Sequence, residues 1–290
     1  MKKNRTEIIK KLNEFREIDL SKKTIREIAI EIDKYLQEIP TTYVVYNKNK
    51  FNNFIFYRVR FNINKDEDIS LIQTYSFPLP QFCNVNGRAN LKGKSVFYSS
   101  NCAFTAIQEC KAEVGAIGYL SIWKPRTNRS MKGTVFLPRN MKEEYSYKDD
   151  PKFAINVKSA LEQIHIDNIV EAEEKINFIA ERFENEKPPY SITSFLSNEV
   201  LYGDLKHDFI VYPSIANEMY TLNFAFHPNI VTNFLYLEKV IRIKLVRIEN
   251  NQYTIGVGKV GYFENGRIIW RQGNSDEINL KNLPMSNIVY

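Results

Sequence analysis

Cysteine, histidine and glycine are scarce in this sequence of 290 residues, and their scarcity argues against several kinds of chemistry. The three cysteines, Cys83, Cys102 and Cys110, are odd in number and form no CxxC pair. This pattern argues against a disulfide framework and against a thiolate zinc site. The three histidines form no HExxH motif. We therefore expect no metal in the functional site.

Motifs of common hydrolases are also missing. The sequence has no P-loop, and no GxSxG elbow surrounds Ser214. We therefore expect neither a Walker-type nucleotide hydrolase nor a serine hydrolase.

Long apolar runs are absent as well. No stretch approaches the roughly 18 apolar residues that a membrane-spanning helix needs. The lysine-rich N-terminus is not followed by the continuous apolar stretch of a secretory signal. The net charge of +6 is modest, and basic residues alternate with acidic ones, which is typical of a solvated surface. We expect a cytoplasmic protein without a membrane partner, and we favour a solvated helical face over a nucleic-acid surface for its basic residues.

Aromatic residues, by contrast, are plentiful, with 17 Tyr and 19 Phe, and such a composition favours packed strands over disorder. Apolar residues at helical spacing predict two helices within residues 1–42, the second ending at Pro40, as a helical N-terminal extension. Residues 43–290 are predicted to form one catalytic domain of the α+β class. Its core motifs span 54–226, and three antiparallel strands follow within 236–272, with turns at Glu249–Asn251 and Glu264–Gly266.

The core motifs fall on alternating strands and helices. Strands are predicted for Phe54–Phe61, Ser95–Ser99, Ile117–Trp123 and His207–Ser214. Helices are predicted for Cys102–Val114 with Asn101 as N-cap, for the segment from Ile169 to Phe183, and for Tyr190–Leu201. The segment 124–190 is expected to be a largely helical insertion.

Five polar or aromatic residues on these elements are candidates for chemistry, although each also has an ordinary interpretation. Arg58 on a strand and Arg88 in a Gly/Asn loop would usually face solvent. Tyr98 on an aromatic strand would usually be core. Glu109 on an amphipathic helix would usually be solvated, and Ser214 after a proline would usually be a turn residue.

The order of these residues along the chain resembles the RES domain, a family named for Arg, Glu and Ser. The matching motifs, in chain order, are Tyr57-Arg58, Gly87-Arg-Ala-Asn90, Gly93, Val96-Phe-Tyr98, Thr105-Ala-Ile-Gln-Glu109, Ile210-Val-Tyr-Pro-Ser214 and Leu222-Asn223. The resemblance covers Phe54 to Phe226. The chain departs from the family at Ala89, where an aromatic residue is common, and in its N-terminal helices and its 124–190 insertion.

The resemblance implies a fold similar to that of the ADP-ribosyltransferase toxins, in which a split antiparallel sheet grips NAD. It also implies cleavage of the bond between nicotinamide and ribose. Arg58 and Arg88 would clasp the pyrophosphate, because a planar guanidinium can donate two parallel hydrogen bonds to it. Tyr98, or more weakly Tyr57, would stack on the cationic nicotinamide ring.

The remaining residues would serve the reacting ribose. Glu109 would stabilise the positive charge that develops on the sugar as the bond breaks. Ser214 would orient Glu109 or a phosphate oxygen, and Asn223 would help to bind NAD. The reaction would need no cofactor beyond NAD as substrate, with inorganic phosphate as an optional co-substrate.

Three functions remain open from the sequence. The first is a toxin-type enzyme that degrades NAD by hydrolysis or phosphorolysis. The second is an ADP-ribosyltransferase that modifies a protein or nucleic acid. The third is a non-catalytic binding module that uses the basic N-terminal helices. A toxin would imply, by analogy, a separate antitoxin chain as partner, and a homo-oligomer is compatible with each of the three.

Overall fold

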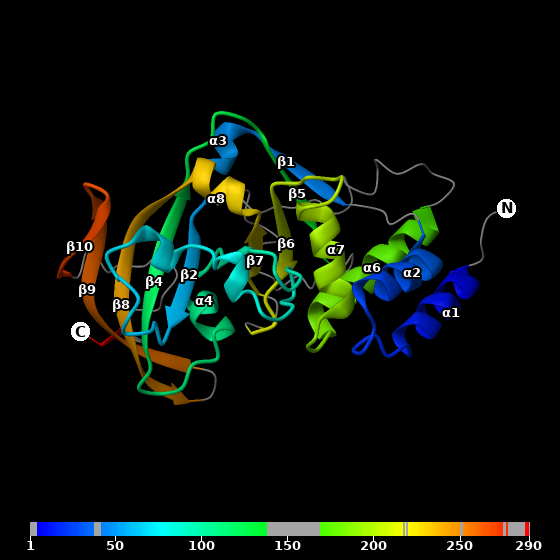
Figure 1. Cartoon of the computed structure of the whole chain (residues 1–290), viewed down its shortest axis with the longest axis horizontal. Helices are drawn as coiled ribbons and strands as arrows, with labels where there is room; N and C mark the ends of the chain where they lie inside the picture. Colours follow the sequence, from blue (N-terminus) through cyan, green and yellow to red (C-terminus); the bar gives the residue numbers. More distant parts are fainter. Residues whose placement is uncertain are drawn as a thin grey trace.

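A computed structural model describes residues 5–37, 42–137, 169–216, 218, 220–249, 252–274, 277 and 288–289. The described chain combines one large, mostly antiparallel sheet with several helices (Figure 1), which confirms the predicted α+β class. None of the described helices has both the length and the apolar character that a membrane crossing requires.

Eleven strands of the described chain form this sheet. They are β1 (Tyr43–Tyr46), β2 (Phe56–Phe61), β3 (Phe97–Ser100), β4 (Ile117–Pro125), β5 (Met131–Val135), β6 (Phe209–Pro213), β7 (Leu222–Phe226), β8 (Leu235–Glu249), β9 (Gln252–Glu264), β10 (Arg267–Gln272) and β11 (Ile288–Val289). Their spatial order is β1-β5-β6-β7-β3-β2-β4-β8-β9-β10, with β11 beside β9. The β5–β6 and β9–β11 pairs are parallel.

The sheet is weakly joined at one place, between β2 and β3. These two strands share a single register pair, Tyr57 opposite Ser100, whereas β2 pairs with β4 over the six residues Phe56–Phe61. We call the β2–β3 junction the seam. It divides the sheet into a β1-β5-β6-β7-β3 half and a β2-β4-β8-β9-β10 half.

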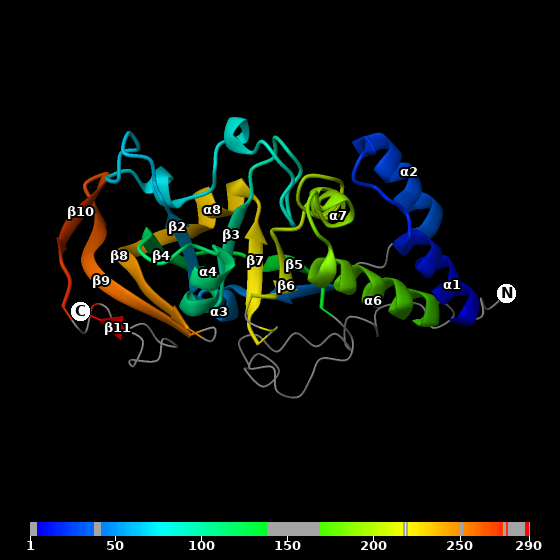
Figure 2. The ribbon, with the colours of Figure 1, turned by 90° about the horizontal axis from the view of Figure 1, so that it is seen from below.

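The helices and short 3-10 turns pack on and around the sheet. They are α1 (Arg5–Arg16), α2 (Ile25–Leu36), α3 (Lys48–Phe51), η1 (Ile72–Tyr75), η2 (Pro80–Phe82), α4 (Ala103–Glu109), α6 (Ile169–Asn185), α7 (Ser191–Leu201) and α8 (Pro228–Phe234). Figure 2 shows α1, α2, α6 and α7 gathered at one end of the molecule, with α4 near its middle. In the described chain α1 packs on α6, which belongs to the insertion, and α2 packs on α7, which follows it.

Aromatic packing fixes this arrangement. Phe15 of α1 stacks on Tyr35 of α2 and on Phe178 of α6, with ring centroids 4.9 and 5.4 Å apart. One face of the central strands carries a cluster of fully buried rings, Phe51, Phe54, Phe56, Phe97, Phe209, Phe224 and Phe226. Each such ring removes a large apolar area from water, so these side chains hold the central strands and α3 together.

Several predicted elements are confirmed. α1, α2, α6 and α7 lie where the helical spacing placed them, although Pro40 is outside the described residues. The three C-terminal strands are β8, β9 and β10. Asn265 and Gly266 join β9 to β10 with φ values of 49° and 82°, as a type I′ hairpin turn requires. Asn250 and Asn251, predicted to form the other turn, lie outside the described residues.

Three predictions about the middle of the chain are wrong in detail. The helix after β3 ends at Glu109 rather than at Val114, because Lys111 adopts a left-handed φ of 47° and stops it. Asn101 is not its N-cap, since the Asn101 side chain instead accepts a hydrogen bond from the Leu222 backbone N–H. The insertion is also not only helical, because it supplies β5, which pairs with β1 and β6.

One glycine run has the spacing of a dinucleotide-binding loop but not its context. Gly256, Gly258 and Gly261 fit GxGxxG, yet all three lie inside the long strand β9. A phosphate-binding loop of that type has to connect a strand to a helix N-terminus. The run therefore carries no Rossmann-type site.

Candidate active site

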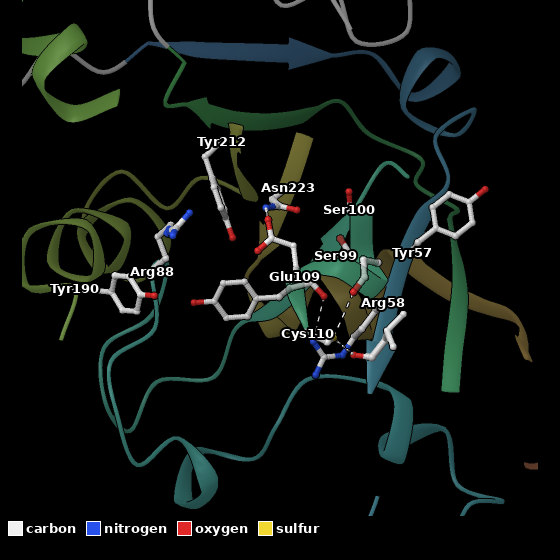
Figure 3. A pocket seen from close by; sticks show the side chains of 13 residues that line it. Tyr57, Arg58, Arg88, Ser99, Ser100, Glu109, Cys110, Tyr190, Tyr212 and Asn223 are labelled. Carbon is white, nitrogen blue, oxygen red and sulfur yellow. Dashed lines mark hydrogen bonds between the residues drawn. The ribbon is translucent and has the colours of Figure 1, made fainter. Parts of the chain in front are cut away.

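A pocket of about 250 Å³ opens at the seam (Figure 3). Its lining comes from β2, β3, α4, β6, β7, the loop before β3 and the start of α7: Tyr57, Arg58, Val59, Arg88, Tyr98, Ser99, Ser100, Ala106, Glu109, Cys110, Tyr190, Tyr212 and Asn223. Six of the seven residues predicted for the site are among them, and the seventh, Ser214, bonds to Glu109. The structure thus brings the predicted set together, whereas the roles of its members stay predictions.

Glu109 is the last residue of α4, and its carboxylate is held from the sheet. One oxygen, Oε1, accepts hydrogen bonds from Ser214 Oγ and from Asn223 Nδ2, both at 2.6 Å. Ser214 is fully buried at the exit of β6, and Asn223 is buried on β7. The other oxygen, Oε2, has no bonded partner in the part of the chain that the structure describes. The carboxylate is therefore fixed in orientation with one oxygen left for a ligand.

The helix that carries Glu109 is itself anchored to the same strands. Thr105, one turn earlier on α4, shares a 2.7 Å hydrogen bond with Thr221, next to the start of β7. Glu109 is thus the last residue of α4, and its carboxylate lies against Ser214 and Asn223 on the sheet side.

Arg58 bridges the seam. Its Nη1 donates to the Tyr98 carbonyl and its Nε to the Ser76 carbonyl, each at 3.1 Å. The guanidinium also lies over the Phe97 ring, 5.5 Å from the centroid. Burial lowers the pKa of Arg58 to about 10, which leaves it protonated at neutral pH. Two of its three nitrogens are engaged by the protein, so Arg58 can offer a ligand less of the bidentate clasp than the sequence predicts.

Arg88 is the freer of the two arginines. Its guanidinium carbon lies over the Tyr190 ring, 5.6 Å from the centroid, and no carboxylate of the described residues forms an ion pair with it. Figure 3 shows Arg88 next to Tyr190, apart from Glu109 and Arg58. A cation without a protein counter-ion at a pocket wall is suited to bind an anionic group of a ligand.

The loop that carries Arg88 is tied to Tyr98. The Tyr98 hydroxyl accepts from the Ala89 N–H and donates to Asn90 Oδ1, both at 2.8 Å. Gly87 and Asn90 close the loop with a backbone bridge. A Cβ on Gly87 would lie 2.3 Å from Asn90 Oδ1 and 2.7 Å from the Tyr98 hydroxyl, so glycine is required here by close approach rather than by φ.

The tyrosines of the pocket differ in what they can contact. Tyr98 and Tyr212 line the interior, and the pKa of Tyr212 is raised well above its ordinary value, first by burial and then by charges that include Glu109. Tyr57, the weaker candidate for stacking, is turned away from Glu109 in Figure 3. Its side chain is buried in a core cluster with Ala103 and Ile107 of α4, so the structure does not favour a stacking role for it.

Seven of the lining residues were not predicted from the sequence, and two of these, Tyr212 and Tyr190, bear on the chemistry of the pocket. Tyr212 sits two residues before Ser214 on β6, opposite Asn223 of β7, and the two-residue period of a strand was a signal that could have found it. Tyr190 was predicted only as the start of a helix, and nothing in the sequence around it indicates a contact with Arg88.

Metal ligands do not cluster in the described residues, where no group of three or more His, Cys, Asp or Glu side chains could hold an ion. The three cysteines are free thiols; Cys83 and Cys102 are buried, and Cys110 is exposed at the pocket.

Comparisons with known proteins add no relative to this picture. No family model, no curated protein and no solved structure matches the chain at a significant level.

Proposed function

We propose that the seam pocket binds NAD and that the protein cleaves the bond between its nicotinamide and its ribose. In this reaction the C1′–N bond breaks and its electron pair leaves with nicotinamide. In hydrolysis a water oxygen forms the new bond to C1′ and its proton passes to solvent; in phosphorolysis an ionised oxygen of inorganic phosphate forms that bond. The sugar carries positive charge in the transition state, as in glycoside hydrolysis.

The observation that carries this proposal is the state of Glu109. Its Oε1 is fixed by Ser214 and Asn223 at 2.6 Å, while Oε2 is left without a protein partner in the described chain. A carboxylate held in advance beside a developing cation stabilises the transition state more than the ground state, and this difference raises the rate.

The other walls suit the rest of the substrate. Arg88, which forms no ion pair with a described residue, and the remaining N–H groups of Arg58 would receive the pyrophosphate. The ring of Tyr98 or Tyr212 would face the pyridinium, an interaction worth on the order of 0.5–2 kcal/mol. A cavity of about 250 Å³ is slightly below the usual range for ligand pockets, roughly 300–1,000 Å³. We therefore place the nicotinamide ribose inside it and the adenosine at its mouth.

The proposal extends to the fold. A sheet joined at β2–β3 by one register pair, with its pocket at that seam, has the organisation expected of the split sheet of ADP-ribosyltransferase-like proteins. The resemblance of the motifs between Phe54 and Phe226 to the RES domain supports the same reading.

A product assay tests the activity. Purified protein is incubated with NAD, with and without inorganic phosphate, and the products are separated by chromatography. Free nicotinamide with ADP-ribose indicates hydrolysis, and nicotinamide with a phosphorylated ADP-ribose indicates phosphorolysis. Glu109→Gln keeps the shape of the side chain but removes its charge, so it should lower the rate by at least 100-fold. Intact NAD in both reactions of the folded wild-type protein would sink the proposal.

The same assay separates the alternatives. Label from NAD that enters macromolecules of a cell lysate would indicate a transferase instead. If the activity depletes NAD in cells, expression of the wild-type chain should arrest growth and expression of Glu109→Gln should not. Equal growth arrest by both chains would favour a binding module without catalysis.

A further inference from the structure

Tyr190 stands at the N-cap of α7 and breaks the usual rules of a helix start. Its φ and ψ are 55° and 46°, a left-handed conformation that bulky residues rarely adopt. N-cap positions favour Ser, Thr, Asp or Asn, whose side chains accept a hydrogen bond from the first turn. The Tyr190 side chain makes no such bond.

Glu186 provides the cap that Tyr190 does not. Its two carboxylate oxygens accept from the backbone N–H groups of Ile192 and Thr193, each at 2.9 Å, and Oε2 also accepts from the Thr193 hydroxyl at 2.7 Å. An unfavourable backbone conformation that the rest of the structure compensates is often found at functional sites. Tyr190 is such a residue, because Glu186 supplies the cap in its place.

The Tyr190 side chain, which does not cap α7, lines the pocket instead. The Tyr190 ring lines it beneath the guanidinium of Arg88, and Figure 3 shows the two side chains next to each other, apart from Glu109. Arg88 itself has no ion pair within the described residues. The ring face is thus the contact that restrains the direction of this guanidinium.

The segment is also braced by the N-terminal helices. Ser191, the neighbour of Tyr190, donates a hydrogen bond from its hydroxyl to the Leu20 carbonyl between α1 and α2, at 3.2 Å. Phe15 of α1 stacks on Phe178 of α6, the helix that precedes the Glu186 turn. The described residues of the extension therefore reach the segment behind the site, and none of them lines the pocket.

We propose that Tyr190 is a positioning residue that holds Arg88 over the pocket to receive a phosphate group of the ligand. The inference rests on the proposed function in taking that group to be the pyrophosphate of NAD. It also gives the N-terminal helices a role, because they support the turn from which Tyr190 projects.

The test uses Tyr190→Asn and Tyr190→Phe in the full chain. Asparagine accepts the left-handed conformation more readily than tyrosine, so the unfolding midpoint should stay level or rise while the ring is lost. Titration calorimetry with inorganic pyrophosphate should then show an affinity weaker by about three- to tenfold. Phenylalanine keeps the ring face and should bind within twofold of wild type.

Tyr202→Leu is the matched control. Tyr202 lies at the other end of α7 and also carries a cation on its ring, Lys94 at 5.1 Å, but it does not line the pocket. Its replacement should leave pyrophosphate affinity unchanged. Wild-type affinity in Tyr190→Asn would overturn the inference, and so would equal weakening in Tyr190→Phe, because the ring face would then not be the cause.

The outcome separates this inference from the proposed function. Pyrophosphate binding is read without turnover, so a protein that leaves NAD intact but loses pyrophosphate affinity in Tyr190→Asn retains the positioning role and loses the activity. In a protein that cleaves NAD, the same variant should raise KM and leave kcat nearly unchanged, since the contact is made in both the bound and the transition state.

Discussion

The hydrogen bond from Ser214 to Glu109 allows the proposed role of Glu109 to be tested without removing the carboxylate. Ser214→Ala deletes one hydroxyl from a fully buried position and leaves its backbone bond to the Thr221 carbonyl intact. Glu109 keeps its bond from Asn223. The substitution therefore loosens the carboxylate without stranding it.

The size of the effect follows from the type of bond. A hydrogen bond to a charged group contributes roughly 1.5–3 kcal/mol. If most of that free energy serves to orient Glu109 in the transition state, kcat should fall by about 10- to 100-fold with little change in KM. The free energy of unfolding should fall by no more than about 1.5 kcal/mol, because Asn223 still satisfies the carboxylate oxygen.

The measurement is steady-state NAD cleavage beside urea unfolding of the same preparations. Thr74→Val serves as the control, because it removes a buried hydroxyl bonded to the Asp68 carbonyl at 2.8 Å, and Thr74 does not line the pocket. It should change stability but not kcat. If Ser214→Ala lowers stability and leaves kcat within twofold of wild type, the bond is structural and the reasoning about Glu109 fails.

Three further predictions concern the surroundings of the site. Burial lowers the pKa of His207 to about 4 from the ordinary 6.5, so protonation favours the unfolded chain. The free energy of unfolding should therefore decrease as pH falls from 6.5 towards 4. Urea unfolding of His207→Gln should show a flatter pH dependence than that of the wild type. Gly87→Ala should push Asn90 off Tyr98 and raise KM for NAD several-fold, measured by initial rates; an unchanged KM would mean that the loop adapts freely. Glu186→Ala should lower the free energy of unfolding by about 1–2 kcal/mol through loss of the α7 cap, and a stability equal to wild type would show that another group takes over.

Much of the fold could be predicted from the sequence where the pattern is local. α6 repeats apolar residues at helical spacing over 17 residues, and the β9–β10 turn carries its Asn-Gly signal. The end of α4 could not be predicted, because the apolar spacing continues past Glu109 while the backbone turns left-handed at Lys111. β5 was missed because its burial comes from pairing with β1 and β6, which are distant in sequence.

In the site, too, the motif order predicted some features, whereas others depend on contacts between distant segments. The motif order singled out Glu109, Ser214 and Asn223, and their hydrogen bonds now give physical content to that grouping. The sequence could not show that two nitrogens of Arg58 donate hydrogen bonds to backbone carbonyls, because these carbonyls belong to Tyr98 across the seam and to Ser76 after η1. Nor could it show that Tyr57 faces the α4 core.

The hydrogen bonds of Arg58 to backbone carbonyls give it a structural role that Arg88 does not share. A guanidinium that bonds Tyr98 of β3 from β2 takes the place of the backbone ladder that the seam lacks, where one register pair joins the two halves of the sheet. Its loss would therefore open the pocket as well as remove a charge, whereas loss of Arg88, whose guanidinium rests on the Tyr190 ring, would remove a charge alone. Arg58→Lys and Arg88→Lys should separate the two: lysine keeps the charge in both, but it cannot reproduce the two bonds of Arg58. The first should lower stability and kcat together, and the second should raise KM for NAD with unchanged stability; equal stability in the two variants would show that Arg58 does not hold the seam.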